Sequence, residues 1–349
     1  MSIYVTYVKD MGLDLGDIIP ATPRKLEDFR GKAVAVDAFN SLYQFLAIIR
    51  QPDGTPLKDS RGRVTSHLSG LLYRTSNLLQ VGIKPVFIFD GKPPKRKAKT
   101  IKLRAQVKER AEKEWQKALE VGDMEKARSK AMQTSRLTED MANQSKNLIK
   151  LMGIPLVQAP GEGEAQASYM AAIGVVFAAA SQDYDSLLFG APTLIRNLAV
   201  TGRRKLPRKN IYVDVQPEEV NSQSVLATLN ISREKLIEMG ILIGTDFNDG
   251  VRGVGPKKAL NLVKKYSSFD VILDTLGVQI EGAEEIKDLF MNPNVIKEFE
   301  LQWDNPDQNG IKEMLCGEHN FSEDRVSGAI EKIVDAGKLR RQKSLDQWF

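Results

Sequence analysis

The sequence predicts an α/β protein whose central sheet is mostly parallel and carries helices on both faces. Short apolar runs alternate with helical patterns, as in KAVAVD at residues 32–37 followed by AFNSLYQFLAIIR. Strands that alternate with helices favour a parallel sheet, because each helix carries the chain back to the same edge. Several runs end in an acidic residue, and ligands gather at the carboxyl ends of parallel strands. The patterns therefore predict both the fold class and the place of a functional site.

Four further runs are expected to form buried strands. They are PVFIFD at residues 85–90, PLVQA from residue 155, VVFAAA from residue 175 and TLIRN from residue 193. The segment GEGEAQASYMAAIG lies between PLVQA and VVFAAA and has a helical pattern. Residues 50–65 are rich in turn-forming residues and join two helical stretches, so we expect an exposed loop there.

A basic helical insertion interrupts the strand pattern over residues 95–144. It lacks a strand signal and is rich in helix formers, which predicts two helices at residues 97–121 and 123–153, broken near Gly122. Residues 91–130 contain 14 Lys or Arg and 6 Asp or Glu, so this segment carries +8 while the remainder of the +5 chain carries −3. Such an excess favours contact with nucleic-acid phosphates, and a solvated charged helix is the alternative. We interpret the insertion as an arch over the edge of the sheet where the functional site is expected.

Seven carboxylates form the candidate metal site. They are Asp37, Asp90, Glu162, Glu164, Asp183, Asp185 and Asp246. Oxygen ligands in this setting suit a pair of hard divalent cations such as Mg²⁺. Helix capping is the alternative for any single strand-end aspartate, including Asp37. Glu162 and Glu164 can reach one ion only if their helix begins there, which Gly161 and Gly163 permit.

A second motif lies at residues 235–266, where two helical patterns flank the turn Gly253-Val254-Gly255-Pro256. Lys257 and Lys258 follow the turn. This helix-hairpin-helix pattern places backbone N–H groups and two lysines at a helix N-terminus, where they can hold a phosphate without reading a base. An ordinary corner between packed helices is the alternative, because glycine often marks helix ends.

Composition excludes several classes of protein. The chain has 42% hydrophobic and 27% charged residues, which is typical of globular proteins. One cysteine, Cys316, excludes an internal disulfide, and with two histidines, His67 and His319, there is no Cys/His cluster for zinc. No apolar run approaches the ~18 residues of a membrane span, and the N-terminus lacks the apolar stretch of a signal peptide. We expect a soluble cytoplasmic protein without a membrane partner.

Taken in order, these motifs resemble the flap endonuclease family, the structure-specific 5′ nucleases of DNA replication and repair. The resemblance runs from about Met11 to the last residue, through VDA, FDG, GEGEAQA, QDYDSL, GTDFN and GVGPKKA. Eukaryotic nuclear members carry a basic tail beyond their clamp-binding motif. This chain stops at that motif, so it resembles an archaeal member.

The resemblance implies a role for each site residue. It assigns one Mg²⁺ to Asp37, Asp90, Glu162 and Glu164, and a second to Asp183, Asp185 and Asp246, some through water; Mn²⁺ could substitute. Lys97 and Arg104 match the basic pair that stabilises charge on the scissile phosphate. Tyr43 matches an aromatic residue on which a nucleobase stacks. The alternatives are core packing for Tyr43, which shares an apolar stripe, and ordinary surface charges for Lys97 and Arg104.

The implied reaction is 5′ flap endonuclease cleavage, with associated 5′–3′ exonuclease activity, at junctions between single-stranded and double-stranded DNA. Two metal ions roughly 3.5–4 Å apart would leave a 5′-phosphate and a 3′-hydroxyl. The implied settings are Okazaki fragment maturation and base excision repair. One alternative is a related 5′ nuclease that prefers bubbles or four-way junctions, and another is a non-catalytic DNA scaffold bound to the sliding clamp.

The C-terminal residues form a third motif. Gln342, Leu345, Trp348 and Phe349 have the spacing of one side of a short helical turn and resemble the box that binds the sliding clamp PCNA. Folding back onto the domain is the alternative, although a free chain end has no core of its own to bury two aromatic rings.

The expected organisation is a single nuclease domain at residues 11–334 in a monomer, between an N-terminal extension at residues 1–10 and a tail at residues 335–349. Within the domain, residues 11–130 contain the start of the arch, which spans about 91–145. Residues 146–265 contain most of the helix-hairpin-helix, and residues 266–334 form a helical part.

Overall fold

Seven strands form one sheet in the part of the chain that the computed structural model describes, which comprises residues 13, 15–205 and 212–345. The strand order is β1-β9-β6-β5-β2-β3-β4, and neighbouring strands from β6 to β4 are parallel. The strands are β1 (Thr22–Pro23), β2 (Ala33–Asp37), β3 (Lys84–Phe89), β4 (Leu156–Gln158), β5 (Ala178–Ala180), β6 (Thr193–Arg196) and β9 (Glu218–Asn221). The predicted mostly parallel sheet is confirmed. The antiparallel strands β1 and β9 at its edge are additional.

Helices cover both faces of the sheet, as predicted. Alternate residues of a strand point to opposite faces, so Val34 and Val36 of β2 join one core while Ala35 joins the other. The first core packs against α2 (Ala38–Ile48) and α3 (Ser66–Val81). The second packs against α7 (Gly163–Ala172). Both faces are therefore buried, which explains the continuous apolar runs of the central strands.

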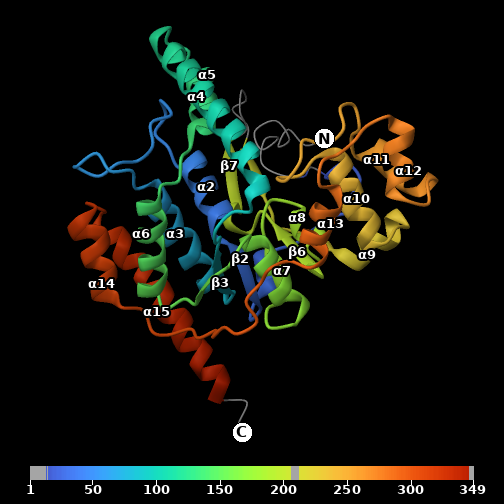
Figure 1. The fold of residues 1–349 in the computed structure, drawn as a ribbon. Coiled ribbons are helices and arrows are strands. Elements are labelled where there is room, and N and C mark those ends of the chain that lie inside the picture. The colour runs from blue at the N-terminus through green and yellow to red at the C-terminus, as the bar shows by residue number, and fades with distance from the viewer. Residues whose placement is uncertain (1–12, 14, 206–211, 346–349) are drawn as a thin grey trace.

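A further layer packs outside α3. It consists of α6 (Glu139–Leu151), α14 (Gln308–Lys312) and α15 (Glu323–Leu345). Figure 1 shows these helices together on the side of the molecule opposite α10. Leu148 and Ile149 of α6 and Val326 and Ile330 of α15 are buried in the same core as α3. The last helices of the chain therefore pack onto the same hydrophobic core as β2.

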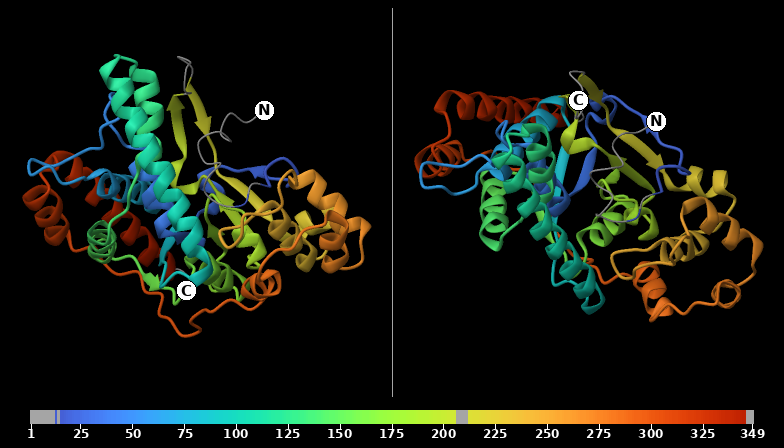
Figure 2. Two further views of the ribbon diagram at one scale, coloured as in Figure 1. Left: turned by 45° about the horizontal axis from the view of Figure 1, so that its top comes forward. Right: turned by 90° about the horizontal axis from the view of Figure 1, so that it is seen from above.

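The basic insertion forms a projecting hairpin of α4 (Ala98–Glu120) and α5 (Met124–Ala131), followed by a 3-10 turn at Met132–Thr134. The hairpin stands above the sheet (Figures 1 and 2). It has a small core of its own, in which Trp115 and Ala118 of α4 pack against Ala127 and Ala131 of α5. Its apolar contacts therefore join the two helices to each other.

The prediction of one helix over residues 123–153 is wrong. The chain leaves the helical conformation at Ser135 and starts again in α6, whose N-cap Thr138 accepts a hydrogen bond from Met141 N at 3.2 Å. Threonine favours this capping position because its hydroxyl satisfies a free N–H group of the first turn. The projecting part of the arch therefore ends near Thr134, while α6 belongs to the main body.

Residues 50–65 form the predicted loop, but it is not exposed at its anchors. Arg50 donates to the carbonyls of Leu46 and Gly54, each at 2.8 Å. Near the other end, Asp59 is buried, accepts from Arg63 Nε at 2.7 Å and lies 3.1 Å from His319 Nδ1. Side-chain contacts therefore hold the loop at two places. The turn-forming residues from which the loop was predicted do not indicate these contacts.

The second half of the chain adds a cluster of helices beside the sheet. This cluster shares one core and comprises α8 (Asp185–Leu188), α9 (Ser222–Leu229), α10 (Arg233–Ile243), α11 (Pro256–Lys265), α12 (Phe269–Leu276) and α13 (Ala283–Met291). A separate antiparallel hairpin joins β7 (Gly202–Lys205) to β8 (Tyr212–Val215). An extended segment then returns along the sheet, where Trp303 Nε1 donates to Pro85 O at 3.0 Å.

The predicted boundary between residues 334 and 335 falls inside α15, which continues to Leu345. Gln342 and Leu345 therefore belong to the last turns of a helix. Trp348, Phe349 and the predicted extension at residues 1–10 lie outside the described residues. Among the described residues, no helix has both the length and the apolar character needed to cross a membrane.

Candidate active site

The sheet brings the acidic residues to one edge. Asp37 ends β2, Asp90 follows β3, and Asp183 and Asp185 lie in the turn after β5. These three strands are parallel neighbours, so their carboxyl ends coincide. Glu162 and Glu164 join them from the start of α7, and Asp246 comes from the connection between α10 and α11. The charges of all seven acids interact, as the pKa shifts below show.

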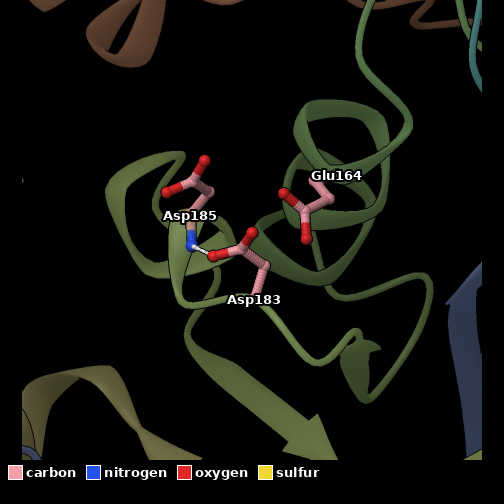
Figure 3. Close-up of side chains that lie close together, drawn as sticks. All are labelled: Glu164, Asp183 and Asp185. Carbon is pink, nitrogen blue, oxygen red and sulfur yellow. Dashed lines mark hydrogen bonds between the residues drawn. The ribbon is translucent and has the colours of Figure 1, made fainter. Parts of the chain in front are cut away.

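Three of the acids are especially close. Oxygen atoms of Glu164, Asp183 and Asp185 all lie within 4.8 Å of one another. Figure 3 shows Glu164 on its helix facing the turn that carries both aspartates, with the Asp185 amide donating to Asp183 Oδ1 at 3.4 Å. Ser181 fixes this arrangement, because its hydroxyl donates to Glu164 and accepts from Asp183 N. Such a set of carboxylate oxygens fits a divalent cation.

Asp185 Oδ1 supports that fit. This atom is buried and has no hydrogen-bond partner among the described residues. A buried carboxylate oxygen without a partner is costly unless a cation or a proton satisfies it. The Asp185 carboxylate also lies close to those of Glu164 and Asp183, so a divalent cation would satisfy it and relieve the repulsion.

Glu164 stands between the two groups that the family resemblance implies. That resemblance placed it with Asp37, Asp90 and Glu162. In the structure it approaches Asp183 and Asp185, and it is also the strongest charged neighbour of Asp37. Two ions bound at the two groups would therefore both lie near Glu164.

The start of α7 explains how Glu162 and Glu164 reach the same edge. Glu162 is the N-cap residue with an extended backbone, and the helix begins at Gly163. Gly163 N donates to Asp90 Oδ1 at 2.7 Å, and a Cβ on Gly163 would lie 2.5 Å from that oxygen. A residue without a side chain is therefore required here. The predicted helix start at these glycines is confirmed.

Asp37 caps a helix and also lies in the acidic site. Its Oδ1 accepts from Asn40 N at 2.9 Å, so it caps α2. It also lies among the other acids, where burial and the charge of Glu164 raise its pKa. Capping and membership of the acidic site are compatible, because a carboxylate has enough lone pairs for both.

Two cations from the base of the projecting hairpin meet the acids. Lys97 pairs with Glu162, and its Nζ lies 3.1 Å from Asp246 Oδ2. Arg104 pairs with Asp246, and Thr100 Oγ1 donates to Asp246 O at 2.9 Å. These contacts bind Asp246 to α4. The cations therefore lie inside the candidate site, beside the acids.

Burial alone would lower the pKa of Lys97, but the carboxylates of Glu162 and Asp246 outweigh it and raise the pKa above that of a free lysine. Lys97 is therefore a permanent cation at physiological pH. Its side chain is largely buried, so its attraction to the acids is only weakly screened by solvent.

Tyr43 lies on α2 beside the site, and its surroundings differ from those of the apolar stripe. Leu42, Phe45 and Leu46 are buried, whereas Tyr43 is half-buried. The Nζ atom of Lys108 lies 4.5 Å from the centre of the Tyr43 ring. The ring is thus reachable from the projecting hairpin, which core packing would not allow.

The second motif also has its predicted local form. Gly253 has a φ of +78°, a left-handed conformation that favours glycine, and Gly255 is the N-cap of α11. Pro256 begins the helix, and Lys257 and Lys258 occupy its first turn. Lys99 of α4 pairs with Asp249 in the same connection. The turn is therefore linked to the base of the projecting hairpin.

Burial and mutual repulsion raise the pKa of the acids. Burial is the largest cause at each. Burial, followed by the charge of Glu164, raises the pKa of Asp37 to about 7. Burial, followed by the charge of Asp37, raises the pKa of Asp90 to about 8. Burial and Asp246 raise the pKa of Asp185 to about 7. Burial and Asp185 raise the pKa values of Glu164 and Asp183 well above their usual range.

Sequence reasoning did not single out three of the residues that shape the site. Ser181 precedes the acidic turn, Thr100 holds the Asp246 backbone, and Arg196 contacts Gln182 and Tyr184. Ser181 stands directly before QDYDSL, so only its place beside that motif could have indicated a role in the site. Thr100 and Arg196 act across long sequence separations that no local pattern encodes.

Comparison with known proteins decides the family. Residues 15–111 match the XPG N-terminal domain and residues 153–246 match the XPG I-region. Flap endonuclease 1 of Thermococcus onnurineus is 53% identical over 344 residues, which cover 97% of this chain and 99% of that protein. The chain belongs to the flap endonuclease family. The predicted family resemblance is confirmed.

Solved structures agree with this family assignment. Flap endonuclease-1 from Methanococcus jannaschii superposes with a TM-score of 0.74 at 43% identity, covering 93% of this chain and 98% of that one. The catalytic core of Rad2, in complex with a DNA substrate, has a TM-score of 0.66 at 24% identity, covering 90% of this chain and 96% of that one. The second likeness concerns the fold alone.

The raised pKa values predict how metal-free stability depends on pH. The folded protein holds protons on Asp37, Asp90 and Asp185 up to pH 7–8, whereas the unfolded chain loses them near the ordinary value of 3.8. Between these values the folded state binds more protons, so the free energy of unfolding falls as pH rises, by about 1.4 kcal/mol per pH unit for each extra proton. Urea unfolding in EDTA at pH 5, 6, 7 and 8 measures this slope, and stability that rises with pH over this range would contradict it.

Proposed function

We propose that the chain is a structure-specific 5′ flap endonuclease that hydrolyses a phosphodiester bond where a 5′ single strand leaves duplex DNA, in DNA replication and repair. The observation that carries the proposal is the buried acidic cluster at the base of the basic projecting hairpin. Membership of the flap endonuclease family over nearly the whole chain supports it. An associated 5′–3′ exonuclease activity would use the same site.

Two Mg²⁺ ions fit the acidic site, and Mn²⁺ could replace them. Asp37, Asp90, Glu162 and Glu164 would hold one ion; Asp183, Asp185 and Asp246, some through water, would hold the other. When bound, such ions supply an activated water and neutralise the leaving 3′ oxygen. The partnerless oxygen of Asp185 and the raised pKa values of Glu164 and Asp183 support this assignment, because burial and mutual repulsion disfavour negative charge there unless a cation compensates it.

Lys97 and Arg104 would stabilise negative charge on the scissile phosphate. Both side chains already lie beside the acids, so they need no long movement to reach a phosphate there. Preorganised cations are effective because they do not reorganise during the reaction. Tyr43 would stack on a nucleobase at the same site, and Lys108, now over its ring, would move aside as the base arrives.

The remaining elements would hold the branched DNA. The projecting hairpin from Ala98 to Ala131 would clamp the 5′ strand, because it is basic and its base contacts the acids through Lys97 and Arg104. The turn before α11 would act as a helix-hairpin-helix, with Gly253 and Gly255 letting the backbone approach a duplex phosphate. The loop at residues 50–65 would help to separate the strands at the junction.

The C-terminal tail would bind the sliding clamp PCNA through Gln342, Leu345, Trp348 and Phe349. This proposal rests on the sequence motif. The chain would act as a monomer whose nuclease domain spans residues 11–334. A scaffold without catalytic activity is disfavoured, because DNA binding alone gains nothing from seven buried or partly buried acids that repel phosphates.

Cleavage of end-labelled DNA tests the proposed activity. We expect Mg²⁺-dependent incision of a 5′ flap, inhibited by EDTA, in preference to a bubble or a four-way junction. Asp185→Asn should reduce the cleavage rate by about 100-fold or more, since loss of even an indirect metal partner commonly costs 10–100-fold. DNA binding in EDTA should stay within a few-fold of wild type.

Asp335→Asn on α15 is the matched control, because it removes an exposed aspartate whose ion pair is with Lys338. It should cleave like wild type. Absence of metal-dependent incision by the wild type would refute the proposed activity, and full activity of Asp185→Asn would remove that residue from the metal group.

The duplex-binding turn is tested by salt dependence. Replacing Lys257 and Lys258 together with alanine should weaken binding to plain duplex DNA. It should also reduce the slope of log affinity against log salt by about 2, one unit for each phosphate that a lysine no longer neutralises. The control replaces Lys264 and Lys265, which end the same helix. Equal slopes for the two double variants would contradict a specific role for the turn.

A further inference from the structure

The turn that carries Asp183 and Asp185 needs support from outside itself. It leaves the sheet after β5 and ends where α8 begins at Asp185. The hydrogen bonds between its acidic residues and Ser181 are long, since Asp183 N lies 3.2 Å from Ser181 Oγ and Asp185 N lies 3.4 Å from Asp183 Oδ1. The two carboxylates repel each other, so contacts from neighbouring elements, such as that of Ser181 with Glu164, help to hold the turn.

Arg196 makes another such contact from the end of β6, the strand next to β5. Its Nε donates to Gln182 O at 3.1 Å, and its Nη1 donates to Tyr184 Oη at 2.6 Å. Its guanidinium also lies 4.3 Å from the centre of the Tyr184 ring. Arg196 thus holds the residue before Asp183 and the residue between the two aspartates.

The remaining contact of Arg196 fixes the guanidinium itself. Its Nη1 lies 3.0 Å from Glu218 Oε2, and Glu218 stands directly opposite Arg196 in the β6–β9 pairing. The Glu218 carboxylate orients the guanidinium and compensates its charge. Arg196 therefore acts on the acids through the geometry of the backbone, which distinguishes it from Lys97 and Arg104.

We propose that Arg196 is a positioning residue that sets the separation of Asp183 and Asp185 and thereby the affinity of the site for its divalent metal. This inference rests on the proposed metal-dependent nuclease. The planar guanidinium suits the task, because it donates from two nitrogens in fixed directions while stacking on an aromatic ring. A lysine has one nitrogen and cannot make the same set of contacts.

The alternative is that Arg196 only stabilises the sheet through its ion pair. The chain contains a matched comparison, since Arg24, directly after β1, pairs with Glu219 of the neighbouring strand β9 at 3.0 Å. Arg24→Met removes a similar Arg–Glu pair from the same edge of the sheet without touching the acidic turn. A purely structural role predicts that Arg196→Met and Arg24→Met behave alike.

The test measures Mn²⁺ binding without DNA. The electron paramagnetic resonance signal of free Mn²⁺ reports how much Mn²⁺ is bound. Arg196→Met should bind Mn²⁺ 10–100-fold more weakly than wild type, the usual effect of losing an indirect metal partner, and Arg24→Met should bind like wild type. Tyr184→Phe keeps the ring and removes only the hydroxyl, so it should have a smaller effect in the same direction. In cleavage assays, Arg196→Met should need correspondingly more Mg²⁺ for half-maximal rate while the KM for DNA is unchanged.

The experiments test the metal site and the role of Arg196 independently. If wild type binds Mn²⁺ and Asp185→Asn does not, the metal site stands; unchanged Mn²⁺ affinity in Arg196→Met would then overturn the role of Arg196 alone. If wild type itself binds no Mn²⁺, the proposed metal site fails. Should Arg196→Met not fold, Arg196→Lys retains the positive charge, and we expect it to weaken Mn²⁺ binding while thermal unfolding remains cooperative. Wild-type affinity in Arg196→Lys would overturn the positioning role.

Discussion

Electrostatic repulsion among buried carboxylates is the constraint on which the rest of the structure depends. Glu164, Asp183 and Asp185 approach within a few ångströms at the end of the sheet, with four further acids around them. Burial makes this arrangement costly, because the charged form of a carboxylate loses its hydration. Two features of the structure offset this cost. The pKa values of the acids are raised, and Lys97 and Arg104 lie among them.

The two cations connect the acidic site to the DNA-binding elements. Lys97 and Arg104 come from the base of the projecting hairpin, and both reach Asp246 on the connection that precedes α11. Lys99 and Thr100 add further contacts to the same connection. A phosphate entering the site would compete for these cations, and a metal would replace them at the acids. The ion pairs therefore link the acidic site to the placement of the hairpin and of the connection before α11.

The strand ends could be predicted because burial on both faces gives continuous apolar runs, and an aspartate directly after such a run has few structural reasons to be there. The helix start at Gly163 could be predicted because Gly161 and Gly163 permit a helix to begin there. The break after Thr134 was missed because most of residues 123–153 are good helix formers, and only the short stretch around Thr134, Ser135 and Thr138 marks the break and the new start. The contacts of Arg196 with Gln182, and of Asp246 with Arg104, depend on tertiary packing that spacing does not encode.

The central claim is that the buried acids keep protons that a metal must displace. Calorimetric titration of the wild-type protein with Mn²⁺ at pH 7, repeated in buffers of different ionisation enthalpy, counts the protons released on binding. Since Asp90 titrates near 8 and Asp37 and Asp185 near 7, the account predicts the release of at least about one proton per protein molecule. Mn²⁺ binding without proton release would contradict it.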